Sequence, residues 1–306
     1  MIVSPTPENI AAAGARLRNG ELVGMPTETV YGLAASLWRP DAIQRTFDLK
    51  GRPADNPLIV HIAHLEQLDA IVADWPGDAR RLAERFWPGA LTMVLPKRPQ
   101  VPSVATGGID TVAVRVPAHP VALRLIDAAG TPLTAPSANP FMGLSPTRAE
   151  HVRLPGLEIV VDGGPCAVGI ESTVVDLSGK RPRLLRPGGV PRAQIEAVLG
   201  RSLEGAEEGV RKAPGSYERH YAPSTPLRLA SSLGAKEAGL SFDPPGSKLQ
   251  VQMPTDPAAY GISMYAALHG IDAMGVSEIV VQEPPHSPEW EAVWDRLERA
   301  ATRSSR

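Results

Sequence analysis

The sequence contains a single cysteine, Cys166, among 306 residues. One thiol cannot form a disulfide within the chain, and it cannot supply a cysteine-based zinc site or an iron–sulfur cluster. No run of about 18 uncharged apolar residues occurs, so no membrane-spanning helix is expected. The N-terminal residues lack the basic and apolar segments of a secretory signal. We therefore expect a soluble, cytoplasmic protein without a membrane contact.

The common nucleotide-binding and hydrolase motifs are also missing. The sequence has neither a Gly-x4-Gly-Lys-Ser/Thr loop nor a Gly-x-Gly-x-x-Gly turn between a strand and a helix. It has no His-Glu-x-x-His pair and no Gly-x-Ser-x-Gly segment. If this protein handles a nucleotide, separate side chains and loop amides must hold it.

Composition nevertheless indicates a folded protein. Hydrophobic residues make up 43% of the chain and charged residues 21%, which provides a core and excludes highly charged disorder. The 28 glycines and 32 prolines predict many turns and fixed loops. The net charge is −2, and the parts before and after residue 210 each carry −1. No basic domain is present, so a surface coated by nucleic acid is not expected.

Helix and strand patterns alternate through the first 200 residues, and some strands follow each other directly. This pattern predicts an α/β fold with a mixed sheet. Helix starts are expected at Thr6, Asp41 and Ser145 because each residue type caps helices. Further helices are predicted over 78–86 and 120–129, and strands over 22–25, 58–62, 91–95, 111–116, 157–161 and 173–177.

Around residues 201–225 the pattern breaks into an acidic, Gly- and Pro-containing stretch, which is typical of a linker. We therefore predict a domain over 1–205, a linker or lid over 206–225 and a small α/β domain over 226–306. The last helix of the small domain has an apolar face formed by Val293, Leu297 and Ala300. No polar cluster stands out in this domain, which favours a scaffolding or regulatory role.

Two segments contain cations that a plain fold would not need. Lys50 and Arg52 are two residues apart, so in an extended chain both side chains point to one side. The compact Lys50 ammonium and the planar, forked Arg52 guanidinium together suit a polyphosphate. Arg115 interrupts an apolar strand, and a buried guanidinium needs an anionic partner such as a substrate carboxylate. The alternative for Lys50 and Arg52 is a solvated pair on the surface, and the alternative for Arg115 is a strand with one face in solvent. His61 closes another apolar strand, where a hydrogen-bonded core histidine is the alternative.

Three other segments carry hydroxyl, amide or basic groups next to predicted strands. They are residues 26–33, 134–147 and 169–189. Ser145 begins a predicted helix, whose free amides would favour a phosphate. Most basic residues of 180–192 fit a solvated surface, but Arg186 lies between an apolar pair and Pro-Gly-Gly. An ordinary turn or surface is the alternative for each segment.

Taken in order, these segments resemble the threonylcarbamoyl-AMP synthase family, the YrdC-like enzymes that make the activated intermediate for the t6A modification of tRNA. The resemblance runs from about residue 8 to residue 200, and Lys50, Arg52, Ser137 and Asn139 resemble the family's hallmark set. Residues 214–223 resemble the linker of the long form, although Ser216-Tyr217-Glu218 departs from the usual Met-containing, more basic stretch. The resemblance implies a YrdC-like twisted mixed sheet with helices, plus a small Rossmann-like α/β C-terminal domain.

The resemblance also implies a reaction. L-threonine, bicarbonate and ATP would give threonylcarbamoyl-AMP and pyrophosphate, which makes the chain a nucleotidyltransferase. Mg2+ would enter with ATP, and no metal site on the protein is expected. Downstream partners would be the proteins that transfer the threonylcarbamoyl group to tRNA, and the fold allows binding of double-stranded RNA or tRNA.

The residues carried over from the family fall into three groups. The catalytic set comprises Lys50, Arg52, Ser137 and Asn139. The ATP-binding set comprises Lys50, Arg52, Asn56, Thr111, Ser137, Ser145, Arg186 and Tyr221, with Tyr221 closing over the site as a lid. The threonine-binding set comprises Thr29, His61, Arg115, Ala135 and Ser172.

Two other functions compete with this interpretation. A non-catalytic RNA-binding module of the same fold is one, although the near-neutral charge disfavours it. A carbamoyl transferase of the hydrogenase-maturation type is the other, but its related domain normally comes with Cys-rich zinc fingers, and this chain has Cys166 alone.

Overall fold

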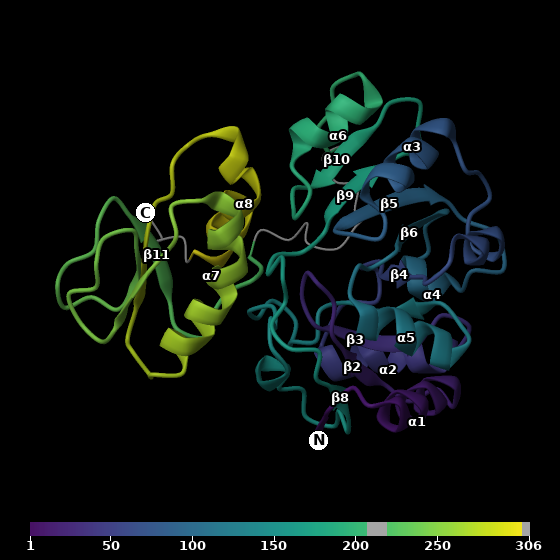
Figure 1. The fold of residues 1–306 in the computed structure, drawn as a ribbon, viewed down its shortest axis with the longest axis horizontal. Helices are drawn as coiled ribbons and strands as arrows, with labels where there is room; N and C mark the ends of the chain where they lie inside the picture. Colours follow the sequence, from purple (N-terminus) through teal and green to yellow (C-terminus); the bar gives the residue numbers. More distant parts are fainter. Residues whose placement is uncertain (207–218, 302–306) are drawn as a thin grey trace.

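The computed structural model describes residues 1–206 and 219–301. These residues form two α/β bodies, each built on its own sheet (Figure 1). The linker residues Ser216-Tyr217-Glu218, which depart from the family pattern, lie outside the described residues. None of the helices within the described ranges has the length and apolar character needed to cross a membrane.

The first body contains a ten-stranded sheet with the order β1-β8-β2-β3-β7-β4-β6-β5-β9-β10. Parallel and antiparallel pairs both occur in it, for example β4 with β6 and β5 with β6, which confirms the predicted mixed sheet. Its strands are β1 (Ile2–Val3), β2 (Val23–Met25), β3 (Gly32–Ser36), β4 (Ile59–His61), β5 (Leu91–Pro96), β6 (Thr111–Arg115), β7 (Leu133–Thr134), β8 (Val160–Val161), β9 (Thr173–Asp176) and β10 (Arg183–Arg186). Its helices are α1 (Pro7–Arg18), α2 (Pro40–Lys50), α3 (Gly77–Phe86), α4 (Ser103–Thr106), α5 (Pro120–Ala129) and α6 (Arg192–Leu199), with 3-10 turns η1 (Leu65–Ala70) and η2 (Ala149–His151).

Local capping chemistry fixes where α1 begins. Thr6 is its N-cap, and the Thr6 Oγ1 accepts a hydrogen bond from the Asn9 amide at 3.3 Å. Ile10 and Leu17 are buried on one face of α1, which packs against α5. The start of the second helix was predicted wrongly. Arg39, not Asp41, is the N-cap of α2, and Asp41 instead pairs with the Arg39 guanidinium at 2.9 Å.

The end of α2 places the first predicted cations. Gly51 adopts the left-handed conformation with φ 63° and caps the helix, so Lys50 is its last residue. The Arg52 amide then donates to the Phe47 carbonyl at 3.0 Å, which fixes the chain as it leaves the helix. Lys50 therefore ends a helix and Arg52 follows its cap, so the two residues do not lie in an extended strand as predicted.

The predicted helix start at Ser145 is wrong. Residues 145–148 are not helical, and only the short 3-10 turn η2 follows. The Pro146 and Thr147 carbonyls, which a helix would use internally, accept the amides of Tyr31 and Cys166 from other segments. No helix N-terminus is therefore available to hold a phosphate at Ser145.

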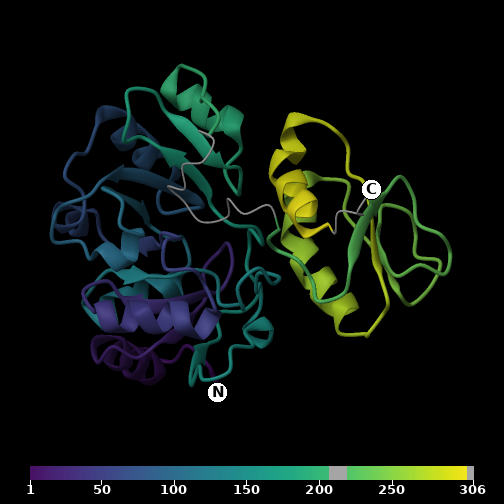
Figure 2. The same cartoon turned by 180° about the vertical axis from the view of Figure 1, so that it is seen from behind.

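The second body contains a four-stranded, entirely parallel sheet with the order β11-β14-β12-β13. Its strands are β11 (Leu227–Ala230), β12 (Gly239–Ser241), β13 (Gln250–Gln252) and β14 (Ile279–Gln282), and its helices are α7 (Pro257–Asp272), η3 (Pro288–Trp290) and α8 (Glu291–Ala300). This arrangement confirms the small Rossmann-like domain. Figures 1 and 2 show α7 and α8 on the side of this domain that faces the first body.

The two bodies are in close contact through α7. A Cβ atom added at Gly169 would lie 2.5 Å from the Ile262 Cα in α7, so only glycine fits there. The His269 Nε2 lies 3.2 Å from the Ser145 carbonyl oxygen, and the His269 ring stacks on His151. The helices of the second body therefore lie directly against the loops that carry the predicted site residues.

Candidate active site

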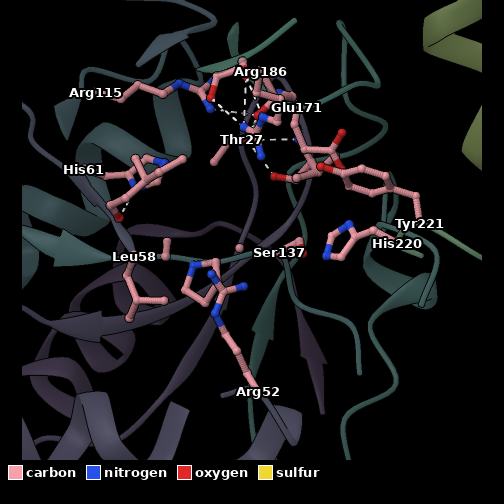
Figure 3. Close-up of a pocket in the computed structure, with 17 residues that line it drawn as sticks. Thr27, Arg52, Leu58, His61, Arg115, Ser137, Glu171, Arg186, His220 and Tyr221 are labelled. Atoms are coloured by element: carbon pink, nitrogen blue, oxygen red, sulfur yellow. Dashed lines mark hydrogen bonds between the residues drawn. The ribbon is translucent and has the colours of Figure 1, made fainter. Parts of the chain in front are cut away.

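A pocket lies where the strand ends and loops of the first body meet the C-terminal part of the predicted linker (Figure 3). Its walls come from the β2–β3 loop, the segments after α2 and β7, the ends of β4, β6 and β10, and the segment before β9. The lining residues are Thr27, Thr29, Val30, Gly32, Arg52, Leu58, Ile59, His61, Arg115, Ala135, Pro136, Ser137, Glu171, Ser172, Arg186, His220 and Tyr221. Nine of the fourteen predicted site residues are in this lining, including all five of the threonine-binding set.

Arg115 lies at the end of β6 with its guanidinium buried. Its Nη1 donates to the Thr29 Oγ1 at 2.9 Å, and its Nε donates to the Gly89 carbonyl at 2.9 Å. Its Nη2 lies 2.5 Å from the Glu28 Oε1, in an ion pair in which both side chains are buried. Because Glu28 balances the charge, Arg115 is stable in the pocket wall without a substrate.

Glu28 was not among the predicted site residues. The signal for it was present, because a buried arginine requires a counter-charge and Glu28 is the acid between the two threonines Thr27 and Thr29. That signal does not single out Glu28 among the acids of the chain, because Glu28 follows β2 and Arg115 ends β6, 87 residues further on. Only the fold brings them together.

His61 also lies in the wall, at the end of β4. Its Nδ1 lies 3.2 Å from the Ile59 carbonyl oxygen. Burial, reinforced by the Arg115 charge, lowers the pKa of His61 to about 3. The imidazole is therefore neutral at neutral pH and adds no positive charge beside Arg115.

Lys50 and Asn139, two of the four hallmark residues, shape a loop rather than line the pocket. The buried Lys50 Nζ donates to the Ser137 carbonyl at 2.6 Å and to the Asn139 carbonyl. The Asn139 Nδ2 donates to the carbonyls of Pro140 and Gly143 at 2.8 and 2.9 Å. Burial, together with the Arg52 charge, lowers the pKa of Lys50 well below its ordinary value. These bonds hold the loop from which Ser137 faces the pocket.

Two further arginines reach the pocket from opposite sides (Figure 3). The Arg186 Nη2 donates to the Ser172 carbonyl at 2.9 Å and to its Oγ at 3.2 Å. The Arg52 Nη2 donates to the Pro57 carbonyl at 3.0 Å. Fixed guanidinium groups of this kind bind phosphate and carboxylate groups well.

Glu171, another residue absent from the predicted set, lines the pocket beside Ser172. Burial would raise the pKa of Glu171, but the charges of Arg296 and Arg186 and a hydrogen bond from Ser145 outweigh burial and hold that pKa at about 2. Glu171 is therefore fully ionised. Ser145 supports this carboxylate and does not line the pocket itself.

His220 and Tyr221 close one side of the pocket. Tyr221 has φ 59°, a conformation that is uncommon for a residue other than glycine. The next amide, that of Ala222, donates to the Met142 carbonyl at 2.9 Å and fixes the chain there. Tyr221 is 1% exposed, and its ring lies edge-on to His220. Tyr221 therefore forms part of the pocket wall, and its covering role stays a prediction.

Four predicted ATP-site or catalytic residues carry a buried polar atom that has no hydrogen-bond partner among the described residues. The atoms are Asn56 Nδ2, Thr111 Oγ1, Asn139 Oδ1 and Tyr221 Oη. Leaving such an atom unpaired costs about 1–3 kcal/mol. All four atoms belong to residues predicted for the site, which indicates that a bound ligand would supply their missing hydrogen bonds.

The structure thus does not place every predicted residue in one lining. Asn56 and Thr111 do not line this pocket, and neither do Lys50, Asn139 and Ser145. Within residues 1–206 and 219–301, no group of three or more His, Cys, Asp or Glu side chains is arranged to hold a metal ion.

An α/β domain whose pocket gathers three buried arginines is suited to small anionic substrates. Comparison with known proteins identifies the family. A family model described as "Telomere recombination" matches residues 15–188, and one described as "Threonylcarbamoyl-AMP synthase, C-terminal domain" matches residues 190–302. The chain belongs to the threonylcarbamoyl-AMP synthase family, in its two-domain form.

Individual relatives agree with this assignment. The threonylcarbamoyl-AMP synthase of Pyrococcus abyssi is 42% identical over 318 residues, which cover 95% of this chain and 94% of the relative. That of Bacillus subtilis is 47% identical over 238 residues, covering 74% of this chain and 68% of the relative. The crystal structure of P. abyssi Sua5 complexed with L-threonine matches with a TM-score of 0.91 and 39% identity, covering 98% of this chain and 97% of that one.

Proposed function

We propose that this protein joins L-threonine, bicarbonate and ATP into threonylcarbamoyl-AMP and releases pyrophosphate, and that it is therefore a nucleotidyltransferase. One observation carries the proposal: all five predicted threonine-binding residues line one pocket together with Arg52 and Arg186. An amino acid and a triphosphate both need fixed positive charge, and this pocket provides it at separate points. The family membership supports the same reaction.

In this proposal Arg115 binds the threonine carboxylate. Its Nη1 contact with Thr29 and its ion pair with Glu28 hold the guanidinium in place before substrate arrives. The neutral His61 and the Ser172 hydroxyl orient the amino acid, and Ala135 presents the main chain of the neighbouring loop. A clamp fixed in advance loses little freedom on binding, which strengthens it.

The nucleotide would lie towards Arg52, Ser137 and Arg186, all of which line the pocket. The Tyr221 Oη, which has no partner in the described part of the chain and lies in the pocket wall, would bond to the nucleotide. Asn56 and Thr111 also carry unpartnered buried atoms, but they lie outside the lining and could reach the nucleotide only if the pocket wall moves. Mg2+ would arrive on the ATP phosphates, where it neutralises their charge. The Ser137 hydroxyl lines the pocket and is a hard oxygen ligand of the kind that Mg2+ or its bound water can use.

The reaction needs little acid–base chemistry from the protein. The threonine amine combines with bicarbonate and releases water, or with CO2 and releases a proton, to give a carbamate, which is already an anion. A carbamate oxygen attacks the α-phosphorus of ATP, a new P–O bond forms, and the bond from that phosphorus to the pyrophosphate oxygen breaks. Positioning and neutralisation of charge dominate such phosphoryl chemistry. A neutral His61 and three arginines suit this requirement better than a strong general base would.

Tyr221 would exclude water from the product, because it covers the pocket and is itself almost fully buried. A mixed anhydride such as threonylcarbamoyl-AMP hydrolyses readily, so shielding preserves it until release. The product must then pass to proteins that transfer the threonylcarbamoyl group to tRNA. The proposed protein partners are therefore transferases, and direct contact with tRNA is not required.

The test is pyrophosphate release from ATP in Mg2+ buffer, measured with and without L-threonine and with and without bicarbonate. Release that requires both would support the proposed reaction. ATP turnover that ignores threonine would indicate another acyl or carbamoyl substrate. A folded protein that binds RNA in a salt-dependent manner but never turns over ATP would instead fit the non-catalytic alternative.

A further inference from the structure

Arg296, in helix α8 of the second body, is the most deeply buried cation among residues 219–301. It is only 1% exposed, and it is among the largest fully buried side chains of the protein. Its Nε lies 2.7 Å from the Glu171 Oε2, and its Nη2 donates to the Pro187 carbonyl at 3.0 Å. Arg296 therefore crosses the boundary between the two bodies and reaches the back of the pocket wall.

The other groups around Glu171 complete its hydrogen bonds. The Ser145 Oγ donates to the Glu171 Oε1 at 2.5 Å, and the Tyr265 hydroxyl in α7 lies 3.2 Å from both carboxylate oxygens. Two of these three partners, Tyr265 and Arg296, belong to the second body. The small domain thus supplies most of what stabilises a carboxylate in the pocket lining.

A carboxylate at this position is unfavourable for the proposed substrates. ATP, pyrophosphate and the carbamate are all anions, and Glu171 is ionised. Glu171 and Arg186 line the same pocket, and the Arg186 charge acts on the Glu171 carboxylate. Without another partner, Glu171 would repel the nucleotide and weaken the attraction of Arg186 for the phosphates.

Arg296 has a second contact, with the residue that covers the pocket. Its Cζ lies 4.8 Å from the centre of the Tyr221 ring, a cation–π contact. From the same helix, the Arg299 carbonyl accepts the His220 amide at 3.0 Å. Helix α8 therefore holds both the carboxylate inside the pocket and the two residues that close it.

We propose that Arg296 is a positioning residue of the active site: it neutralises Glu171, so that this carboxylate does not repel the nucleotide from the pocket, and it orients the Tyr221 ring over the pocket. The small domain, expected from its sequence to lack a polar cluster, thereby completes the electrostatics of a site on the other domain. This inference rests on the proposed function, because it assumes that the pocket receives a nucleotide.

The experiment compares ATP binding and turnover in wild type, Arg296→Met, Arg296→Lys, Glu171→Gln and the double variant Arg296→Met/Glu171→Gln. We expect Arg296→Met to weaken ATP binding by about 10- to 100-fold, because it leaves a buried carboxylate without its main partner. Arg296→Lys keeps the positive charge but loses the planar guanidinium group. Its ATP affinity should therefore lie between those of wild type and Arg296→Met. Adding Glu171→Gln to Arg296→Met should recover about tenfold of the loss, because the uncompensated charge is then gone.

The matched control is Arg192→Met. Arg192 also joins the two bodies, through the Glu291 carboxylate at 2.6 Å, but this pair is about one-third exposed and lies outside the pocket lining. We expect ATP binding within twofold of wild type for this control. Folding of each variant is checked by thermal denaturation, and should Arg296→Met alone fail to fold, the double variant and Arg296→Lys answer the same question.

Three results would overturn the inference. The first is an Arg296→Met variant that binds ATP as tightly as the Arg192→Met control. The second is a double variant whose fold loss in ATP affinity equals the product of the two single losses. The third is an Arg296→Lys variant that binds ATP no more tightly than Arg296→Met. ATP binding by calorimetry needs neither threonine nor bicarbonate. A wild type that binds ATP but fails the threonine-dependent release assay would therefore refute the proposed reaction and still leave the role of Arg296 measurable.

Discussion

The Lys50 ammonium nitrogen lies 2.6 Å from the Ser137 carbonyl oxygen and also donates to the Asn139 carbonyl. Three of the four hallmark residues are thus joined through one buried group, at the end of α2. The contact is with main-chain oxygens, so Lys50 acts on the geometry of the loop that presents the Ser137 hydroxyl. This differs from a lysine whose charge points directly at a phosphate.

The first prediction concerns this contact. Replacing Lys50 by Met should lower kcat/KM by about 100-fold, because two buried carbonyls then lose a donor at about 1–3 kcal/mol each and the loop shifts. Steady-state kinetics measures the loss, with Lys180→Met as the control because Lys180 is exposed. Activity near that of wild type in Lys50→Met would show that the loop keeps its shape without the lysine.

The second prediction concerns Arg115. Replacing it by Ala should raise the threonine KM by about 100-fold or more and change ATP binding little, because a fixed guanidinium bound to a carboxylate contributes several kcal/mol. Removing Arg115 also leaves Glu28 as an uncompensated buried charge. The variant Glu28→Gln/Arg115→Ala separates this loss of stability from the loss of the clamp. If the double variant regains wild-type threonine kinetics, Arg115 is not the clamp.

Local chemistry explains what could be predicted from the sequence. Helix α5 begins and ends at the predicted residues, Pro120 and Ala129, because a proline at its first position and Gly130 at its end act within a few residues. The inward faces of α2 and α8 follow from apolar spacing alone, as Ile43, Phe47 and Leu297 show. Arg115 and Arg186 could be predicted as buried cations because charge is exceptional among apolar neighbours, whereas Arg52 was predicted from its spacing to Lys50.

Long-range bonding explains what could not be predicted. The wrong helix start at Ser145 has the residue types of a cap, but distant amides take the carbonyls that a helix needs. Strand β3 went unpredicted because its small residues carry little strand signal, although all five are buried. The partner of Glu171 is Arg296, 125 residues away, and nothing in the local pattern of either residue indicates the other.

The third prediction concerns Gly188, which follows β10 and lies against the main chain just before β9. A Cβ at this position would lie 2.3 Å from the Glu171 carbonyl oxygen and 2.5 Å from the Ser172 carbonyl carbon, both main-chain atoms that cannot move freely. Gly188→Ala should therefore lower both Tm and kcat/KM by displacing Ser172 and Arg186, with a stability loss of about 1–3 kcal/mol. Gly179→Ala is the control, since a Cβ there meets nothing within 4 Å. Equal melting temperatures for the two variants would contradict this account of the pocket wall.

The fourth prediction concerns pH and His220. Burial, reinforced by the charges of Arg52 and Arg186 although Glu171 opposes them, lowers the pKa of His220 to about 3 from an ordinary value of 6.5. The pKa is lowered in the closed form, in which His220 and Tyr221 line the pocket, so this form requires a neutral His220 ring. The contribution of His220 to the stability of the closed form is fully present above about pH 6.5 and is lost progressively as the pH falls from 6.5 towards 3.

At pH 5.5 the loss amounts to about 1.4 kcal/mol, or about tenfold in the population of the closed form. The ATP KM should therefore rise about tenfold between pH 7.5 and pH 5.5 in wild type and clearly less in His220→Gln, which cannot take up the proton. ATP titrates in the same range, but it does so equally for both proteins, so the ratio of their KM values isolates His220. His61 is present in both proteins too, and its lowered pKa acts on unfolding rather than on closure because it lies within β4. Parallel profiles for the two proteins would mean that His220 can be protonated without opening the pocket, and closure would then depend on Tyr221 alone.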